Sequence, residues 1–107
     1  MTNAHLVLTT IGSKDGAEQL AHQLVERRLA ACVNIVGPIR SFYRWKERIE
    51  QEDEYLLLIK TTTAQTAQLQ AAFKELHSYE LPECVELAID GGSEAYLAWL
   101  AGAVGKK

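Results

Sequence analysis

Residues 31–61 read ACVNIVGPIRSFYRWKERIEQEDEYLLLIKT, and the fold follows from this segment. Its β-branched, aromatic and leucine side chains favour two strands that run antiparallel and meet at a reversal near residues 46–48. Roughly a dozen residues per strand, at about 3.3 Å each, would span about 40 Å, whereas an ordinary strand has about five or six residues. We therefore expect one long β-hairpin that extends beyond the rest of the domain.

Two local features modify this hairpin. Gly37-Pro38 interrupts the outgoing strand, and because proline cannot donate to a β-ladder we expect an edge, a bulge or a bend there. The charged run at residues 50–54, EQEDE, precedes the apolar part of the returning strand. It indicates that the tip of the hairpin lies largely in water.

Simple antiparallel pairing predicts the register of the hairpin. If the turn spans residues 46–48, Asn34 lies near Lys60 and Cys32 lies near Thr62. The kink can shift this pairing by one residue.

Strand-like and helix-like patterns alternate on both sides of the hairpin. Along the chain they predict a strand at 5–10, a helix from 15, the hairpin, a helix from 63, a strand at 84–90 and a last helix from 93. Asp15 and Glu18 match a capping box for the first helix, and Thr63 and Ser93 are the expected N-caps of the other two.

This β-α-β-β-α-β order predicts an α+β, ferredoxin-like fold with an extra C-terminal helix, in one single domain of residues 1–107. Right-handed crossovers give a four-stranded antiparallel sheet with two helices on one face. The first strand of the long hairpin then lies at a sheet edge, where Phe42, Tyr43 and Trp45 need a cover. The simplest cover is another copy of the chain in a heterologous contact that closes into a ring, so we expect a homotrimer.

Composition excludes several classes of partner. The net charge is −3, and no basic run occurs beyond Lys106-Lys107, which argues against nucleic acid as a partner. The longest apolar stretches are too short to span a membrane, and the N-terminus lacks the pattern of a signal peptide. We therefore expect a cytoplasmic protein in which Cys32 and Cys84 are reduced thiols.

Four motifs in order resemble the CutA family of divalent-cation tolerance proteins. They are RLAACVNI at 28–35, SFYRWK at 41–46, LIKT at 58–61 and HSYELPE at 77–83. The likeness covers about residues 5–100. It implies a cytoplasmic homotrimer of ferredoxin-like protomers, joined through the long hairpin and similar in build to the PII signalling proteins.

The chain departs from the family pattern at several positions. In some relatives a cysteine at the end of the first strand and a His-His pair after the second helix are taken as copper ligands. Here Thr9 and Leu76-His77 occupy the corresponding positions. Ser78 replaces a usual proline, which predicts a looser loop around His77, and Glu47 replaces a usual glycine, which predicts a different type of turn at the hairpin tip.

The candidate metal ligands are His77, Glu80 and Cys32. His77, Tyr79 and Glu80 bring an imidazole, a phenol and a carboxylate to one loop, and Cys32 of a neighbouring chain can add a thiolate across the trimer interface. Such donors suit copper(II) or zinc, and we expect no other cofactor. The alternative is structural: His77 ends a helix, Tyr79 packs at an interface, and Cys32 is a small buried hydrophobe.

Lys60 suggests a second kind of site, because a lysine in an apolar strand needs an anionic partner. One interpretation is an intersubunit cleft for a small anion or metabolite, formed with Asn34 and walled by Tyr43, Trp45 and Tyr79. The other is a salt bridge from Lys60 to Glu80 or Glu83 of another subunit.

Two functions follow from these candidate sites. The first is a non-enzymatic homotrimer that binds divalent metal and contributes to tolerance of divalent cations. The alternative is a PII-like sensor with a metabolite in the cleft between subunits. An enzyme is disfavoured, since the chain has no nucleophile motif and no P-loop.

Overall fold

The computed structural model describes residues 2–106, and residues 1 and 107, the ends of the expected domain, lie outside the described part. Its elements, in order, are β1 (Ala4–Ile11), α1 (Lys14–Glu26), β2 (Cys32–Trp45), β3 (Arg48–Thr62), a 3-10 turn (Thr63–Gln65), α2 (Thr66–Leu76), β4 (Val85–Ala88) and α3 (Glu94–Gly102). This order confirms the predicted succession of strands and helices.

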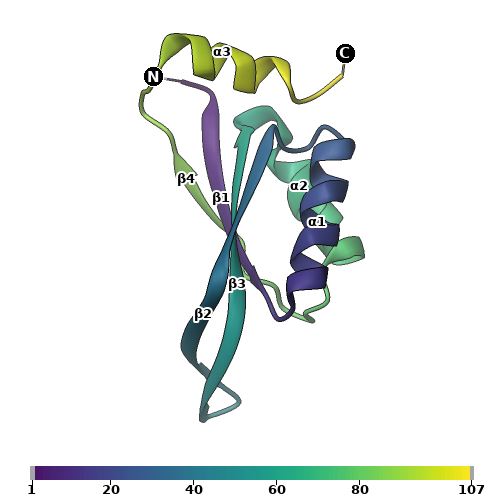
Figure 1. Cartoon of the computed structure of the whole chain (residues 1–107), viewed down its shortest axis with the longest axis vertical. Helices are drawn as coiled ribbons and strands as arrows, with labels where there is room; N and C mark the ends of the chain where they lie inside the picture. Colours follow the sequence, from purple (N-terminus) through teal and green to yellow (C-terminus); the bar gives the residue numbers. More distant parts are fainter. Residues whose placement is uncertain (1, 107) are drawn as a thin grey trace.

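The four strands form one antiparallel sheet in the order β2-β3-β1-β4. Helices α1 and α2 lie on one face of it (Figure 1). The ferredoxin-like fold predicted from the sequence is therefore confirmed, with β2 at one edge of the sheet and the short β4 at the other.

The β2–β3 hairpin makes the molecule long. Its strands have 14 and 15 residues, and the longest extent of the molecule is 44 Å against 25 and 22 Å in the other directions. Figure 1 shows the hairpin turn projecting well beyond α1 and α2. The prediction that the hairpin outruns the rest of the domain is confirmed.

The register of the hairpin differs from the predicted one. Cys32 lies opposite Lys60, and Asn34 lies opposite Leu58, so each is two residues from its expected partner. One residue of the difference comes from the turn, which is only two residues long. The other comes from a bulge between Val36 and Ile39, at the predicted kink.

The main core lies between the sheet and the two helices. It combines alternate residues of β1 and β3 with the inner faces of α1 and α2, namely Val7, Ile11, Leu57, Ile59, Ala17, Leu20, Leu24, Leu69, Ala72 and Phe73. Because side chains alternate along a strand, the intervening residues point to the opposite face of the sheet. We call that opposite face the open face.

Helix α3 covers only one end of the open face. It lies across the end of the sheet farthest from the hairpin turn (Figure 1). There Leu100 and Val104 form a second, smaller cluster with Ala4 and Ala31. The rest of the open face stays partly exposed, and Leu87 of β4 is 45% exposed.

The helix caps are partly as predicted. Ser93 caps α3, because its hydroxyl accepts from the backbone N–H of Tyr96. The N-cap of α1 is Ser13 and not Asp15, since the Ser13 hydroxyl accepts from the N–H of Gly16. Thr63 does not cap α2 either, because it begins the 3-10 turn that precedes the helix.

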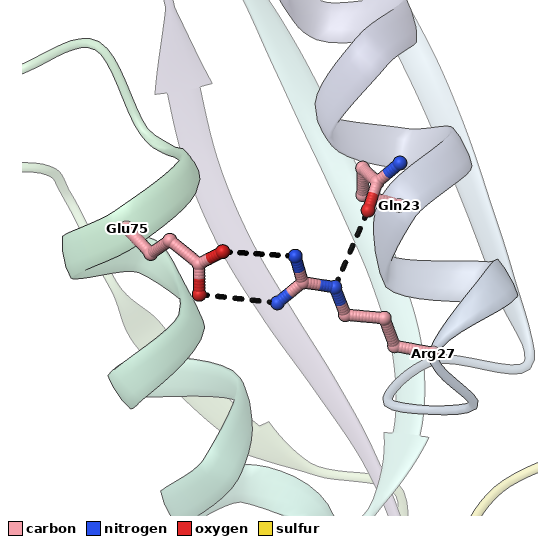
Figure 2. A network of polar contacts seen from close by, with 3 residues as sticks. All are labelled: Gln23, Arg27 and Glu75. Atoms are coloured by element: carbon pink, nitrogen blue, oxygen red, sulfur yellow. Dashed lines mark hydrogen bonds and ion pairs between the residues drawn. The ribbon is translucent and has the colours of Figure 1, made fainter.

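A polar network joins the end of α1 to α2 on the surface. The guanidinium of Arg27 donates two hydrogen bonds to the carboxylate of Glu75, at 3.2 and 2.9 Å, and its Nε donates to Gln23 (Figure 2). The arginine lowers the pKa of the Glu75 carboxyl group by hydrogen bonding and charge attraction. The pair is exposed to water, so it positions the two helices more than it stabilises them.

None of the helices within residues 2–106 combines the length and apolar character needed to cross a membrane.

Although Glu47 stands where the family usually has glycine, the hairpin turn has the left-handed backbone that glycine adopts most easily. Lys46 and Glu47 have φ angles of 51° and 68°, the conformation of a type I′ turn. The expectation that the departure at Glu47 changes the kind of turn therefore finds no support in the backbone.

We predict that Glu47→Gly raises the free energy of unfolding by about 1 kcal/mol, because a left-handed backbone is unfavourable for residues with a side chain. Urea unfolding at a fixed protein concentration measures this change. Glu50→Gly, in the regular part of β3, should instead lower stability by about 0.5–1 kcal/mol. A Glu47→Gly variant no more stable than the parent would contradict the explanation.

Candidate functional site

His77 fixes the loop after α2 to the sheet. It is 8% exposed, and its Nε2 lies 2.9 Å from the carbonyl oxygen of Thr10 and 3.2 Å from the hydroxyl of Thr9. Its Nδ1 accepts from the backbone N–H of Tyr79 at 3.1 Å. Nε2 must therefore carry the proton, and both ring nitrogens are engaged.

This arrangement suits a neutral imidazole. Burial lowers the pKa of His77, while the bond to Thr10 and the charge of Glu54 act weakly in the opposite direction. A metal would need a free lone pair on one of the ring nitrogens. Within one chain, His77 offers none unless its bond to Tyr79 breaks, so the role of His77 as a metal ligand stays a prediction.

Tyr79 connects the same loop to the hairpin. Its hydroxyl donates to Oε2 of Glu54 at 2.7 Å. Gly12 makes this possible, since a Cβ at that position would lie 3.1 Å from the Tyr79 hydroxyl. Burial, followed by the bond to Glu54, raises the pKa of Tyr79, so its hydroxyl stays a donor.

The charged run 50–54 indicated a hairpin tip in water, but its last residue, Glu54, is buried. This residue is 5% exposed, because the loop carrying Tyr79 folds over it. The rest of the run agrees with the prediction better, since Gln51, Glu52 and Asp53 are exposed.

A cavity of about 880 Å³ lies between the hairpin and the loop after α2. Tyr43 and Trp45 line it from the hairpin, and Tyr79 lines it from the loop. The structure thus brings together the three aromatic residues predicted to wall a ligand cleft.

The charged side chains that line the cavity are acidic. Its lining includes four carboxylates, from Glu52, Glu54, Glu80 and Glu83, and no lysine or arginine of the described chain. Burial, and then the charge of Glu54, raises the pKa of Glu83. The pKa of Tyr43 is raised mainly by its hydrogen bond to Glu52.

The remaining predicted residues lie elsewhere. Lys60 stands opposite Cys32, and its ammonium group lies 5.8 Å from the centre of the Tyr96 ring on α3. Asn34 lies beside Cys32, with its Oδ1 3.8 Å from the sulfur. Lys60 is six positions beyond Glu54 along β3, which corresponds to about 20 Å.

The predicted metal ligands therefore do not meet within one chain. Cys32 is at the α3 end of the sheet, Glu80 lines the cavity, and His77 is bonded to β1. In residues 2–106 no three His, Cys, Asp or Glu side chains converge in a way that could hold a metal ion. Both cysteines are free thiols, as predicted.

The sequence analysis missed Glu52, Glu54 and Gly12 as residues of this site. Glu54 carries a signal, because it continues the alternation of Leu56 and Leu58 toward the open face. Gly12 carries no signal in the sequence, since its role depends on how the loop after α2 returns to the sheet.

Known proteins resemble this chain along almost its whole length. The family model described as CutA1 divalent ion tolerance protein matches residues 5–103. The divalent-cation tolerance protein CutA of Thermus thermophilus is 47% identical over 95 residues, which are 89% of this chain and 92% of that protein. The solved structure of the divalent cation tolerance protein (Cut A1) from the same organism has a TM-score of 0.93 at 45% identity, and the match covers 95% of this chain and 99% of that chain.

A longer relative matches as well. The chloroplastic CutA protein of Arabidopsis thaliana is 39% identical over 95 residues, which are 89% of this chain and 52% of that protein. The chain therefore spans about half the length of this plant relative.

We predict that His77 makes stability depend on pH. Because its folded pKa is lowered, its stabilising effect is fully present above the unfolded pKa of about 6.5 and is lost as the pH falls through the lower folded value. At pH 8, His77→Gln should lower the free energy of unfolding by about 1–3 kcal/mol, and the difference from the parent should shrink toward pH 5. Chemical unfolding at several pH values measures both effects.

His22→Gln is the matched control, since His22 is an exposed histidine on α1. It should leave the free energy of unfolding unchanged across this range. A constant gap between the parent and His77→Gln from pH 5 to pH 8 would show that His77 is not held in its neutral form.

Proposed function

The chain belongs to the CutA1 divalent ion tolerance family, and from that membership we propose that it is a non-enzymatic, cytoplasmic homotrimer that binds a divalent metal ion. Copper(II) and zinc are the ions we expect, and the function is a contribution to divalent-cation tolerance. The single observation that carries this proposal is the family match over residues 5–103.

The surface of the chain supports the homotrimer. Strands β2 and β4 form two different open edges of the sheet. Apolar side chains on the open face remain partly exposed, including Val36 at 44%, Val85 at 47% and Leu87 at 45%. Edges and apolar faces of this kind need a cover, and repeated contact between two different surfaces forms a ring when the rotation between copies closes.

We predict that the parent protein has three times the 11.9 kDa mass of one chain in solution. Leu87→Glu places a charge on the open face and should reduce the mass to that of one chain. Val25→Glu is the matched control, because Val25 is 42% exposed on α1, away from the open face. Light scattering after size exclusion measures the masses, and a parent protein of 11.9 kDa at micromolar concentration would exclude the homotrimer.

A metal site would have to be shared between copies of the chain. Cys32 and Glu80 are accessible donors, a soft thiol and a carboxylate, but they lie in different parts of one chain. His77 does not fit as a donor in its present bonding. The proposed site therefore combines Cys32 of one copy with Glu80 of another.

We predict that the reduced, metal-free protein binds zinc or copper(II) at one site per chain, more tightly than about 100 μM, or roughly −5.5 kcal/mol. Calorimetric titration should show binding weakened at least tenfold by Cys32→Ser and weakened by Glu80→Gln. Cys84→Ser is the matched control, because Cys84 is the other free thiol, and it should bind as the parent does. Equal binding by the parent and Cys32→Ser would exclude the thiolate as a ligand.

The cavity favours a second candidate function. It is large enough for a small molecule, and four aromatic residues line it: Phe42, Tyr43, Trp45 and Tyr79. These features support a PII-like sensor that holds a metabolite. Within one chain Lys60 lies at the other end of the sheet, so its part in this candidate would have to come from another copy.

A further inference from the structure

Among residues 2–106, no basic side chain forms an ion pair with the carboxylate of Glu54. The residue is only 5% exposed. The only hydrogen bond of its side chain to the described residues is the one that Tyr79 donates to Oε2. A buried carboxylate with one neutral donor is unfavourable unless a cation comes near.

Other carboxylates near Glu54 increase its need for a nearby cation. Glu52, Glu80 and Glu83 line the same cavity, and no basic side chain of the described residues does. Carboxylates around a hollow with apolar walls concentrate a negative potential inside it. The cavity therefore attracts cations and repels the anionic ligand that the sequence suggested.

The size and walls of the cavity indicate the kind of cation. A bare metal ion needs three or four converging donors, and none of the described residues form such a group. The volume of about 880 Å³ lies instead in the range of pockets for small organic molecules. Tyr43 and Trp45 add aromatic rings, which attract ammonium and guanidinium groups.

We propose that this cavity binds a small organic cation with an amine or guanidinium group, with Glu54 as its anionic partner and Tyr43 and Trp45 as its aromatic walls. Amine and guanidinium groups carry several N–H donors, which can reach the free oxygen of Glu54. The inference rests on the second candidate function. The cavity shares Glu80 with the proposed metal site, so metal-free protein is used to test it.

Direct binding tests the inference. Metal-free protein at low salt is titrated with agmatine and spermidine, and separately with ATP and citrate as anionic probes. Calorimetry gives the stoichiometry, and Trp45 fluorescence in a Trp99→Phe background reports on the cavity. We expect agmatine or spermidine to bind once per chain with a Kd below about 1 mM, which is roughly −4.1 kcal/mol, and the anions not to bind.

Two variants locate the site. Glu54→Gln keeps an acceptor for Tyr79 but removes the charge, and it should weaken binding at least tenfold. Glu18→Gln removes the same charge from an exposed position on α1 and should bind as the parent does. Trp45→Leu, at a side chain that is 38% exposed, should weaken binding severalfold without loss of folding. Circular dichroism and the melting temperature confirm that each variant is folded.

The other outcomes each overturn the inference and can be told apart. Equal binding by the parent and Glu54→Gln would place the cation elsewhere. Binding of ATP or citrate that changes Trp45 fluorescence would keep the sensor function and refute the ligand class. No binding of any probe would refute both, and would indicate that a basic side chain of another copy fills the cavity.

Discussion

The bulge between Val36 and Ile39 determines which side chains of the outer hairpin reach the candidate site. Directly opposed residues of an antiparallel pair project to the same face, and one extra residue in β2 exchanges the faces of everything beyond it. Beyond the bulge, Ile39 lies opposite Glu54 and Trp45 lies opposite Arg48. Tyr43 and Trp45 therefore point to the open face, together with Glu54, and not to the side of α1 and α2.

The loop after α2 supplies the other side chains of the candidate site. His77 ties it to β1, and Tyr79 then reaches Glu54 across the gap. A histidine in a family named for divalent ion tolerance suggests a ligand at once, but here its two nitrogens serve the backbone. The side chains that remain free in this region are carboxylates and aromatic rings, so the ligand proposed here is a cation and not the anion that Lys60 suggested.

The fold could be predicted from the sequence, and the site only in part. Periodicity, Gly37-Pro38 and the order of elements predicted the topology and the bulge, because these depend on local chemistry. The register could not be predicted, since it depends both on whether the turn has two residues or three and on the extra residue at the bulge. The burial of Glu54 could not be predicted either, because its cover comes from Tyr79, 25 positions along the chain.

The two faces of the sheet are covered by different kinds of event during folding. The side of α1 and α2 is sealed by residues of one chain, so its formation is a unimolecular event. The open face is sealed by α3 only at one end, and any further cover must come from a collision between molecules, which depends on concentration. A newly made chain can therefore acquire its topology before it meets another copy. Dilute and crowded conditions would then differ in how long the open face stays exposed to unrelated partners and to self-association in the wrong arrangement.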